Sequence, residues 1–417
     1  MLSPGAKGWI NKYFDLVEKE VINLTIDRPP ELRKLHFMHL TLGESGMTFG
    51  YPIDLIFAKE LETREWTTRE KLKLLLFEAQ LFVYLQIHLD EPFNKDAFLN
   101  KLYAFYHYHN ASSIKKLLKM FSRPNREERI EEVLRDRTSI ESNYFENKWW
   151  VNTLSNAFIY LDVILFDDYL HWHREEAIKN YSSYAKNALI ALTLSAYSDG
   201  LVEKHEKKLF DVYLASANLD DESRDLVKSK FINGASLNDF SLYIPNHWLL
   251  KRFLFDLSAL NIFSHQELMD KETKFLEELA VNLEVKEEEM EESFGMIENF
   301  VLKAQDKAEF LSNNSSYEKV YRSLIGRWTK VLERNKDRIA EELKESKELV
   351  SLVNKSRKKE LTLKEKEAVK KQFKDIVRSI PALAIFMIPG GTLLLPIVLK
   401  VIPDLIPSAF RENELDD

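Results

Sequence analysis

The chain of 417 residues has no cysteine and few glycines and prolines, 11 and 12 respectively. Without cysteine it can form no disulfide, no thiolate metal site and no cysteine nucleophile, which fits a reducing compartment. Few glycines and prolines leave few points where regular structure must break, whereas the abundant Leu, Lys, Glu and Ala residues favour long helices. We therefore expect an all-α protein.

Charge and apolar content narrow the class further. The net charge is −8 and the sequence pI is near 5.8, so the charge balance does not indicate a nucleic-acid partner. The first 20 residues contain no apolar run behind a basic start, so we expect no cleaved signal peptide. A hydrophobic content of 45% supplies enough apolar surface for two or three cores.

The first half of the chain is typical of packed helices. From Glu31 to about Tyr184 the apolar residues recur at amphipathic-helix spacing. One of these helices should begin at Thr67, because Glu70 follows at capping-box spacing. The many Tyr, Phe and Trp residues in this half are best explained as side chains that fill the spaces between helices. We place an N-terminal helical domain at residues 1–185.

Residues 187–299 contain a weak internal repeat. Each copy has an apolar helix, a short break and a charged helix, so a duplicated pair of helical hairpins is the simplest account. In the second copy, Ser264 and Glu267 have the spacing of a helix-starting capping box. The first copy has an apolar helix, a turn with Asp-Gly and a helix with an early Glu, at Ala196, Asp199, Gly200, Val202 and Glu206. This pattern resembles the TerB-like tellurite-resistance family, and we assign residues 186–300 to a TerB-like helical domain.

The turn in the first copy is a candidate metal site. Asp199 lies in the turn, and Glu203 and Glu206 lie one helical row apart just after it, so three carboxylates could surround a divalent cation. In the alternative, which we favour, Asp199 caps the next helix and Gly200 supplies a turn residue with positive φ.

Other patterns that could carry chemistry are incomplete. The GESG stretch at residues 43–46 lacks the following Lys of a phosphate-binding loop, and no calcium-binding EF-hand loop is present. The His-x-His pairs at residues 107–109 and 171–173 would point to diverging faces of a helix, which disfavours a shared metal ion. We expect no cofactor and no enzymatic activity.

A basic block precedes the most apolar part of the chain. After a charged helical linker at residues 301–360, the stretch 355–378 holds ten basic and four acidic residues, a local charge of +6. Residues 379–399 then carry no charge over 21 residues, about 30 Å as one helix and about the thickness of a bilayer core. Pro389, Gly390 and Gly391 interrupt this run, at a cost on the order of 3 kcal/mol for Pro and 1 kcal/mol for each Gly. A kinked span, a re-entrant hairpin and a buried soluble hairpin remain open.

Charge on either side of the apolar run predicts an orientation. The basic block lies before the run, whereas the tail after Leu399 has a net charge of −3 despite Lys400. Positive flanks favour the cytoplasmic side and anionic headgroups, so the bulk of the chain should be cytoplasmic. Lys400 lies so near the end of the run that it can reach the headgroups.

The segment 361–417 carries a dense set of motif residues. A helix opens with Leu-Thr and leads to an Asp-x-x-Arg-x-x-Pro turn, an apolar run, Leu-Leu-Pro, an apolar-Lys pair and a proline-rich ending with Pro-Ser-x-Phe. The residues are Leu361, Thr362, Asp375, Arg378, Pro381, Leu394, Leu395, Pro396, Leu399, Lys400, Pro403, Pro407, Ser408 and Phe410. This set resembles the membrane-associated segment of the LETM-type (leucine zipper/EF-hand transmembrane) family. Thr362 and Glu365 also have capping-box spacing, which predicts a helix start there.

The resemblance implies a membrane-linked protein. Expected partners are membrane lipids and either another protein or a second copy of the chain. The basic residues expected to contact anionic lipids are Lys358, Lys359, Lys370, Lys371 and Lys374. In typical members a module resembling a ribosome-binding domain follows the apolar run, whereas seven residues follow Phe410 here, so the ribosome is a weakly supported partner.

The order of a helical region, a TerB-like unit and a LETM-type segment resembles bacterial LETM-related biofilm-associated proteins. This resemblance implies a bacterial inner-membrane location. The leading hypothesis is a membrane-anchored, biofilm-associated adaptor with a cytoplasmic helical interaction module. One alternative is an oligomeric component of cation/proton homeostasis or transport, because one broken span cannot enclose a pathway alone. The other is a TerB-like stress protein that binds divalent cations.

Overall fold

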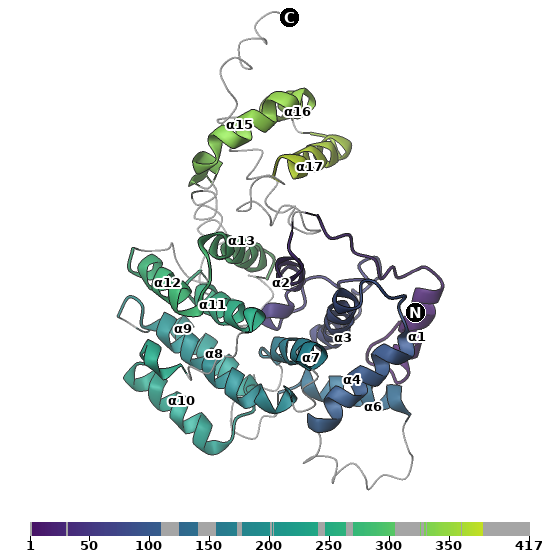
Figure 1. Cartoon of the computed structure of the whole chain (residues 1–417), viewed down its shortest axis with the longest axis vertical. Helices are drawn as coiled ribbons and strands as arrows, with labels where there is room; N and C mark the ends of the chain where they lie inside the picture. The colour runs from purple at the N-terminus through teal and green to yellow at the C-terminus, as the bar shows by residue number, and fades with distance from the viewer. Residues whose placement is uncertain are drawn as a thin grey trace, which may run out of the picture.

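Every regular element in the described part of the chain is a helix (Figure 1). The computed structural model describes residues 2–30, 32–109, 125–140, 156–172, 177–200, 202, 204–240, 247–263, 270–304, 326, 329–330, 332–359 and 361–377. The predicted all-α class is confirmed for these residues.

The N-terminal helices begin where local chemistry favours a start. Thr67 and Glu70 form the predicted capping box: the Glu70 amide donates to the Thr67 hydroxyl at 3.2 Å, and the Thr67 amide donates to the Glu70 carboxylate at 2.8 Å. The helices of this part are α1 (Trp9–Glu18), α2 (Lys34–Glu44), η1 (Met47–Phe49), α3 (Thr68–Ile87), α4 (Lys95–His109), α6 (Arg126–Arg137), α7 (Tyr160–Trp172) and η4 (Ala177–Asn180).

Two of the next helices are apolar, and each is followed by a more charged helix. The helices of this region are α8 (Tyr181–Ala196), α9 (Lys204–Ser216), α10 (Asp221–Asn233), η5 (Leu237–Asp239), α11 (Trp248–Phe263), α12 (Asp270–Leu283) and α13 (Glu287–Ala304). The two apolar helices, α8 and α11, lie against each other, and Ser258 donates to the Ala191 carbonyl at 3.1 Å between them. The predicted cap at Ser264 lies outside the described residues, and the TerB-like duplication stays a prediction.

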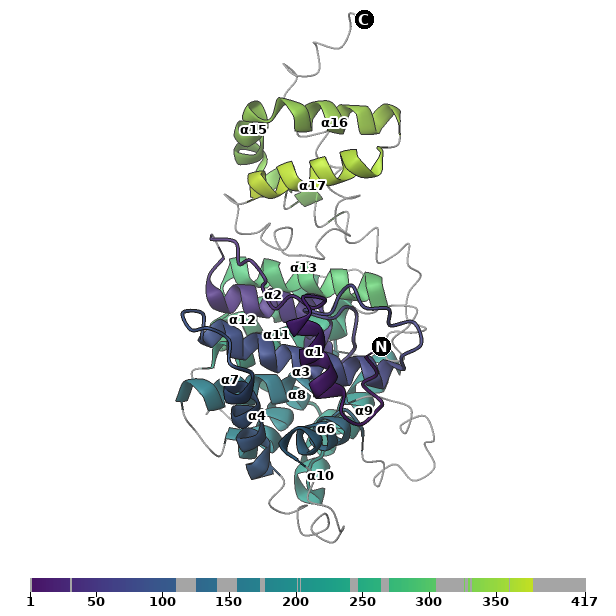
Figure 2. The ribbon, with the colours of Figure 1, turned by 90° about the vertical axis from the view of Figure 1, so that its right-hand side faces the viewer.

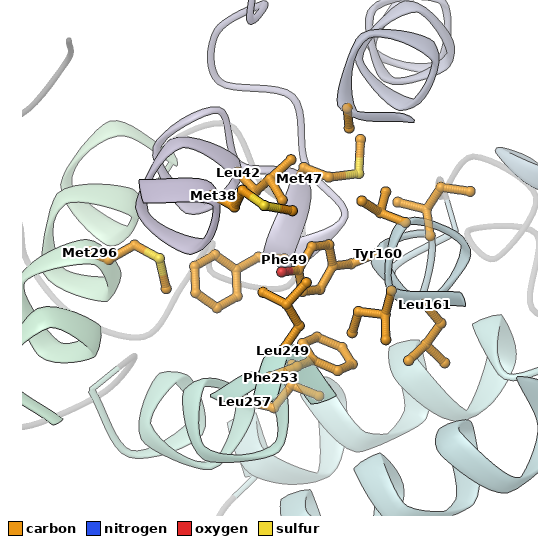
Figure 3. Packing of buried hydrophobic residues seen from close by; sticks show 14 of the residues in the cluster. Met38, Leu42, Met47, Phe49, Tyr160, Leu161, Leu249, Phe253, Leu257 and Met296 are labelled. Carbon is orange, nitrogen blue, oxygen red and sulfur yellow. The ribbon is translucent and has the colours of Figure 1, made fainter. Parts of the chain in front are cut away.

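Apolar side chains from distant parts of the chain meet in one core. Figure 3 shows Met38 of α2, Phe49 of η1, Tyr160 of α7, Phe253 of α11 and Met296 of α13 converging. Helices from both sides of the predicted boundary at residue 185 therefore share this core. The boundary itself stays a prediction, but α2 packs directly on α13 across it.

The last described helices form a small group of their own. They are α15 (Lys336–Glu345), α16 (Lys347–Lys358) and α17 (Leu363–Val377), and they lie beyond α13 in both views (Figures 1 and 2). Their buried residues recur at helical spacing and face one another. These residues are Ile339, Leu349, Val353, Val369, Phe373 and Ile376.

Candidate functional site

The hairpin of α16 and α17 presents lysines outward. Lys364 and Lys371 are exposed and lie seven residues apart, so they share one face of α17, whereas Val369 and Phe373 are buried on the other. Lys359, in the turn between the two helices, is also exposed. The hairpin is therefore amphipathic, with an apolar side toward α15 and a basic side toward solvent.

The start of α17 is fixed by the predicted capping box. The Thr362 amide donates to the Glu365 carboxylate at 2.9 Å, and the Glu365 amide donates back to the Thr362 hydroxyl at 3.4 Å. Lys355 of α16 forms an ion pair with the same carboxylate. The Lys355 hydrogen bond, together with those from Thr362, lowers the pKa of Glu365 to about 2. These contacts join the two helices of the basic hairpin.

The structure places the predicted lipid-contact residues on this hairpin. Lys358 lies in α16, and Lys370 and Lys374 lie in α17. Lys359 and Lys371 are exposed, as expected for contact with headgroups.

The predicted membrane segment lies outside the described residues, which end at Val377. Among the helices that are described, none is long and apolar enough to span a bilayer. The choice between a span, a re-entrant hairpin and a buried hairpin therefore stays open. The predicted segment residues beyond Val377 are Arg378, Pro381, Pro389, Gly390, Gly391, Leu394, Leu395, Pro396, Lys400, Pro403 and Pro407.

The predicted metal site is only partly described. Gly200 has a φ of 96°, which confirms the predicted positive-φ turn. Asp199 lies in this turn and Glu206 is buried in α9, but Glu203 lies outside the described residues. In the parts of the chain that the structure describes, no group of three or more His, Asp or Glu residues could hold a metal ion. A site formed with Glu203 stays a prediction.

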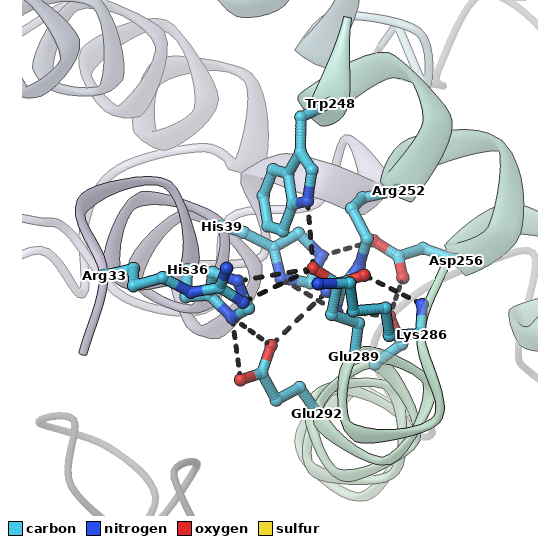
Figure 4. A network of polar contacts seen from close by, with 10 residues as sticks. Arg33, His36, His39, Trp248, Arg252, Asp256, Lys286, Glu289 and Glu292 are labelled. Atoms are coloured by element: carbon cyan, nitrogen blue, oxygen red, sulfur yellow. Dashed lines mark hydrogen bonds and ion pairs between the residues drawn. The ribbon is translucent and has the colours of Figure 1, made fainter. Parts of the chain in front are cut away.

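A second candidate site is a buried polar network between α2, α11 and α13 (Figure 4). His36 of α2 lies between two carboxylates of α13. Its Nδ1 is 2.9 Å from both oxygens of Glu292, and its Nε2 is 3.3 Å from Glu289. The Trp248 indole of α11 donates to the same oxygen of Glu289 at 3.0 Å. The three helices are thus joined through one imidazole ring.

His39, one turn further along α2, has a different environment. Its Nε2 is 2.7 Å from Asp256, and its Nδ1 is 3.4 Å from an Arg252 nitrogen. Because Arg252 can only donate, Nδ1 must accept and Nε2 must carry the proton. His39 is therefore a neutral ring. Arg252 also donates to Glu292 at 3.3 Å and to Ser293 at 2.9 Å, which connects the two histidines.

The pKa values in this network shift in opposite directions. Burial lowers the pKa of His39, and the nearby Arg252 charge adds to that effect. Burial also disfavours charge on His36, but its hydrogen bonds to Glu289 and Glu292 outweigh burial and raise its pKa. Burial is likewise outweighed at Glu289, where contacts with His36, the Lys286 amide and Trp248 lower the pKa to about 2. The pKa of Glu292 is also lowered, because the His36 hydrogen bond and the Arg252 charge overcome burial.

Sequence reasoning did not identify this network. Its usable signal is the stretch HFMHL, where two histidines three residues apart lie in an otherwise apolar helix. That spacing predicts a shared helix face but not the partners, because His36 and Glu292 are 256 positions apart. The histidine pairs at residues 107–109 and 171–173 are the more conspicuous pattern in the sequence. Of these, the Nδ1 of His171 donates locally to Asp167, one turn earlier in α7.

Comparison with known proteins gives a family match at the C-terminal segment and a match to a curated protein. Residues 361–417 match the family model described as LETM1-like, RBD. A stretch of 62 residues is 42% identical to the LETM1 domain-containing protein YLH47, mitochondrial, of Saccharomyces cerevisiae (strain ATCC 204508 / S288c). This alignment covers 14% of the present chain and 14% of the yeast protein. No solved structure matches the chain.

These matches confirm the predicted LETM-type resemblance of the C-terminal segment. They do not extend to the region predicted to be TerB-like, and they do not bear on a biofilm role. The yeast relative is mitochondrial by name, so the bacterial inner-membrane location stays a prediction.

Proposed function

We propose that the chain is a membrane-docking helical protein of LETM type, in which the basic hairpin α16–α17 contacts anionic lipid headgroups. The observation that carries the proposal is the position of the exposed lysines. Lys359, Lys364 and Lys371 lie on the solvent side of a folded hairpin, and the uncharged run at residues 379–399 begins two residues after α17 ends. Headgroup contact and apolar insertion would therefore be adjacent along the chain.

The expected binding free energies indicate that lysine contacts and apolar insertion must act together. Each Lys near an anionic surface contributes about 1 kcal/mol, so Lys359, Lys364 and Lys371 together contribute about 3 kcal/mol, or roughly 100-fold in affinity. Such a contribution alone gives weak, reversible binding. Insertion of the apolar run would add the larger part. The helices from α1 to α13 would then form a non-enzymatic module that binds a protein partner or a second copy. A biofilm-associated role rests on the family resemblance alone.

Vesicle co-sedimentation tests the proposal. The variant K359E/K364E/K371E should bind vesicles of phosphatidylglycerol and phosphatidylcholine roughly 100-fold more weakly than the wild type, or weaker still. A matched control reverses three lysines that are also exposed but lie on α9 and α12, as K204E/K207E/K274E. Both variants change the net charge by the same amount. The control should bind like the wild type, because its lysines are distant in sequence from the apolar run.

Two outcomes would contradict the proposal. One is equal loss of binding in both variants, which would indicate a general charge effect rather than a docking face. The other is recovery of the full-length wild-type chain entirely in the supernatant with anionic vesicles.

A further inference from the structure

In the described residues, the His36 side chain of α2 contacts two buried carboxylates of α13, those of Glu289 and Glu292. The His36 side chain is 7% exposed, and those of Glu289 and Glu292 are 4% exposed. Both ring nitrogens of His36 face carboxylate oxygens, at 2.9 Å and 3.3 Å. A carboxylate can only accept, so both nitrogens must donate, and only the doubly protonated imidazolium does that. The geometry therefore requires a positive His36.

The charges around this imidazolium balance. Arg33, His36 and Arg252 supply three positive charges against Asp256, Glu289 and Glu292. Removal of the His36 proton would leave one nitrogen lone pair facing a buried carboxylate and an uncompensated negative charge, both of which are costly in a buried site. The charged groups in contact with His36 are Glu289 and Glu292 from α13, and Arg33 at the start of α2 pairs with Glu289. The charged and titratable groups behind these carboxylates are Arg252 and Asp256 from α11 and His39 from α2, which contact Glu292 or one another.

We propose that a proton on His36 holds α2 against α13 and α11, and that loss of this proton as the pH rises loosens α2 from the rest of the fold. The inference does not rest on membrane docking, because none of the network residues belongs to α16 or α17. Trp248 adds to the stabilisation that depends on the positive charge of His36. Its ring lies 5.0 Å from the His36 ring and 5.0 Å from the Arg252 guanidinium, so one aromatic side chain contacts both cations.

The direction of the pH effect follows from the two protonation states. The pKa of His36 is raised in the folded protein above its usual value of 6.5. The stabilising contribution is therefore fully present below about pH 6.5 and is lost as the pH rises through the folded pKa. The neighbouring titratable groups do not produce this loss of stability. Glu289 and Glu292 have lowered pKa values and stay ionised, and His39 has a lowered pKa and stays neutral.

Loosening of α2 would expose apolar surface. Phe37, Met38 and Leu42 of α2 are fully buried, and Met38 and Leu42 face the shared core beside Met296 of α13 (Figure 3). The surface uncovered on α11 and α13 is apolar and helical.

Hydrogen exchange of the full chain tests the proposal. Peptides of α2 are followed between pH 6 and pH 9, with rates corrected for the intrinsic pH dependence of exchange. Between pH 6.5 and the folded pKa of His36, the opening constant of α2 should rise by up to tenfold per pH unit and then level off. Peptides of α8, which lies outside the network, should show a smaller rise, because they report only global unfolding, to which groups such as Glu78 contribute. In His36→Gln the rise should disappear, whereas His171→Gln should retain it, because His171 pairs with Asp167 instead.

A direct measurement covers the case in which His36→Gln does not fold. In the wild type, the His36 ring signal in a histidine-labelled NMR spectrum should titrate above pH 6.5, and Glu292→Gln should move that titration to lower pH. The proposal is overturned if the His36 signal titrates at or below pH 6.5, or if α2 and α8 open with the same corrected pH dependence. Survival of the rise in a folded His36→Gln variant would overturn it equally.

Discussion

Glu78 is a fully buried carboxylate that holds a loop and a helix to α3. Its oxygens accept hydrogen bonds from the amides of Ile56, Phe57 and Ala58 at 2.6, 3.1 and 2.9 Å. The Tyr13 hydroxyl of α1 donates to it at 3.1 Å. Burial raises the pKa of Glu78 to about 7, although the three amides and Tyr13 act in the opposite direction. One side chain therefore stabilises contacts to two separate segments.

The variant Glu78→Gln tests this role. Because the pKa of Glu78 rises from 4.5 to about 7 on folding, its protonation stabilises the fold fully below pH 4.5, and this contribution is lost as the pH rises through about 7. The full change is on the order of 3 kcal/mol. Urea unfolding of the wild type should show stability falling from pH 5 to pH 8, and this part of the slope should vanish in Glu78→Gln. The variant should also be less stable at pH 5, since its NH₂ group would face backbone donors. An unchanged slope would contradict the assignment.

Local residue chemistry could be predicted from the sequence, whereas long-range pairing could not. Thr67 and Glu70 were predicted as a cap because the partners are three residues apart and need no knowledge of the fold. Glu78 carries no such local signal, because a glutamate in an amphipathic helix is expected to face water. In the structure α3 is buried on nearly all sides from Leu72 to Tyr84, so Glu78 lies in the core.

At the scale of elements, the turn after η1 depends on a glycine. Gly50 has a φ of 64°, and a Cβ added there would lie 2.5 Å from the Ala157 Cα. The close approach brings the α2–η1 segment against the start of α7. No rule of local sequence predicted this contact, since the two residues are far apart in the chain.

Gly50→Ala should destabilise the protein by about 2–4 kcal/mol, the sum of left-handed backbone strain and backbone overlap. Gly200→Ala is the matched control. Gly200 also has a positive φ, of 96°, but no atom lies within 4 Å of an added Cβ. It should cost only the strain, about 1–2 kcal/mol. Denaturant unfolding of both variants checks the difference, and equal losses would show that the contact with Ala157 is unimportant.

The two capping boxes allow a comparison between elements. Thr362→Ala and Thr67→Ala each remove one cap, worth about 1 kcal/mol. Because α3 lies in the main core, Thr67→Ala should lower the global free energy of unfolding by this amount. Thr362→Ala should instead raise hydrogen exchange at the start of α17 by roughly fivefold and leave the core unchanged. A loss of global stability in Thr362→Ala as large as in Thr67→Ala would indicate that the hairpin and the core unfold together.

At the scale of the whole molecule, composition predicted the helical class but not the course of the chain. Scarce Gly and Pro and abundant helix formers were sufficient for the all-α prediction. The packing of α2 on α13 was not predictable. It joins residues 36 and 292, and no local pattern in the sequence indicates that these residues pair. The C-terminal motif was identified by family resemblance, whereas its apolar run lies outside the described residues.

Charge is distributed so that docking should depend on salt. The whole chain has a net charge of −8, whereas residues 355–378 carry +6, so the rest of the chain is repelled by an anionic surface that attracts the hairpin. An increase in ionic strength from 0.1 to 1 M shortens the Debye length from about 10 to 3 Å and removes most of both effects. For the wild type, apolar insertion should preserve part of the vesicle binding at 1 M salt.

A chain ending at Val377 separates the two contributions. It keeps the basic hairpin and lacks the apolar run, so only the electrostatic part remains. This chain should bind anionic vesicles weakly at 0.1 M salt and not measurably at 1 M, whereas the full chain should retain binding at both. Vesicle co-sedimentation across this salt range, with neutral phosphatidylcholine vesicles as the control, distinguishes the contributions. Salt-resistant binding by the shortened chain would place the membrane contact elsewhere, since the side chains that the structure describes in the hairpin form no exposed apolar run.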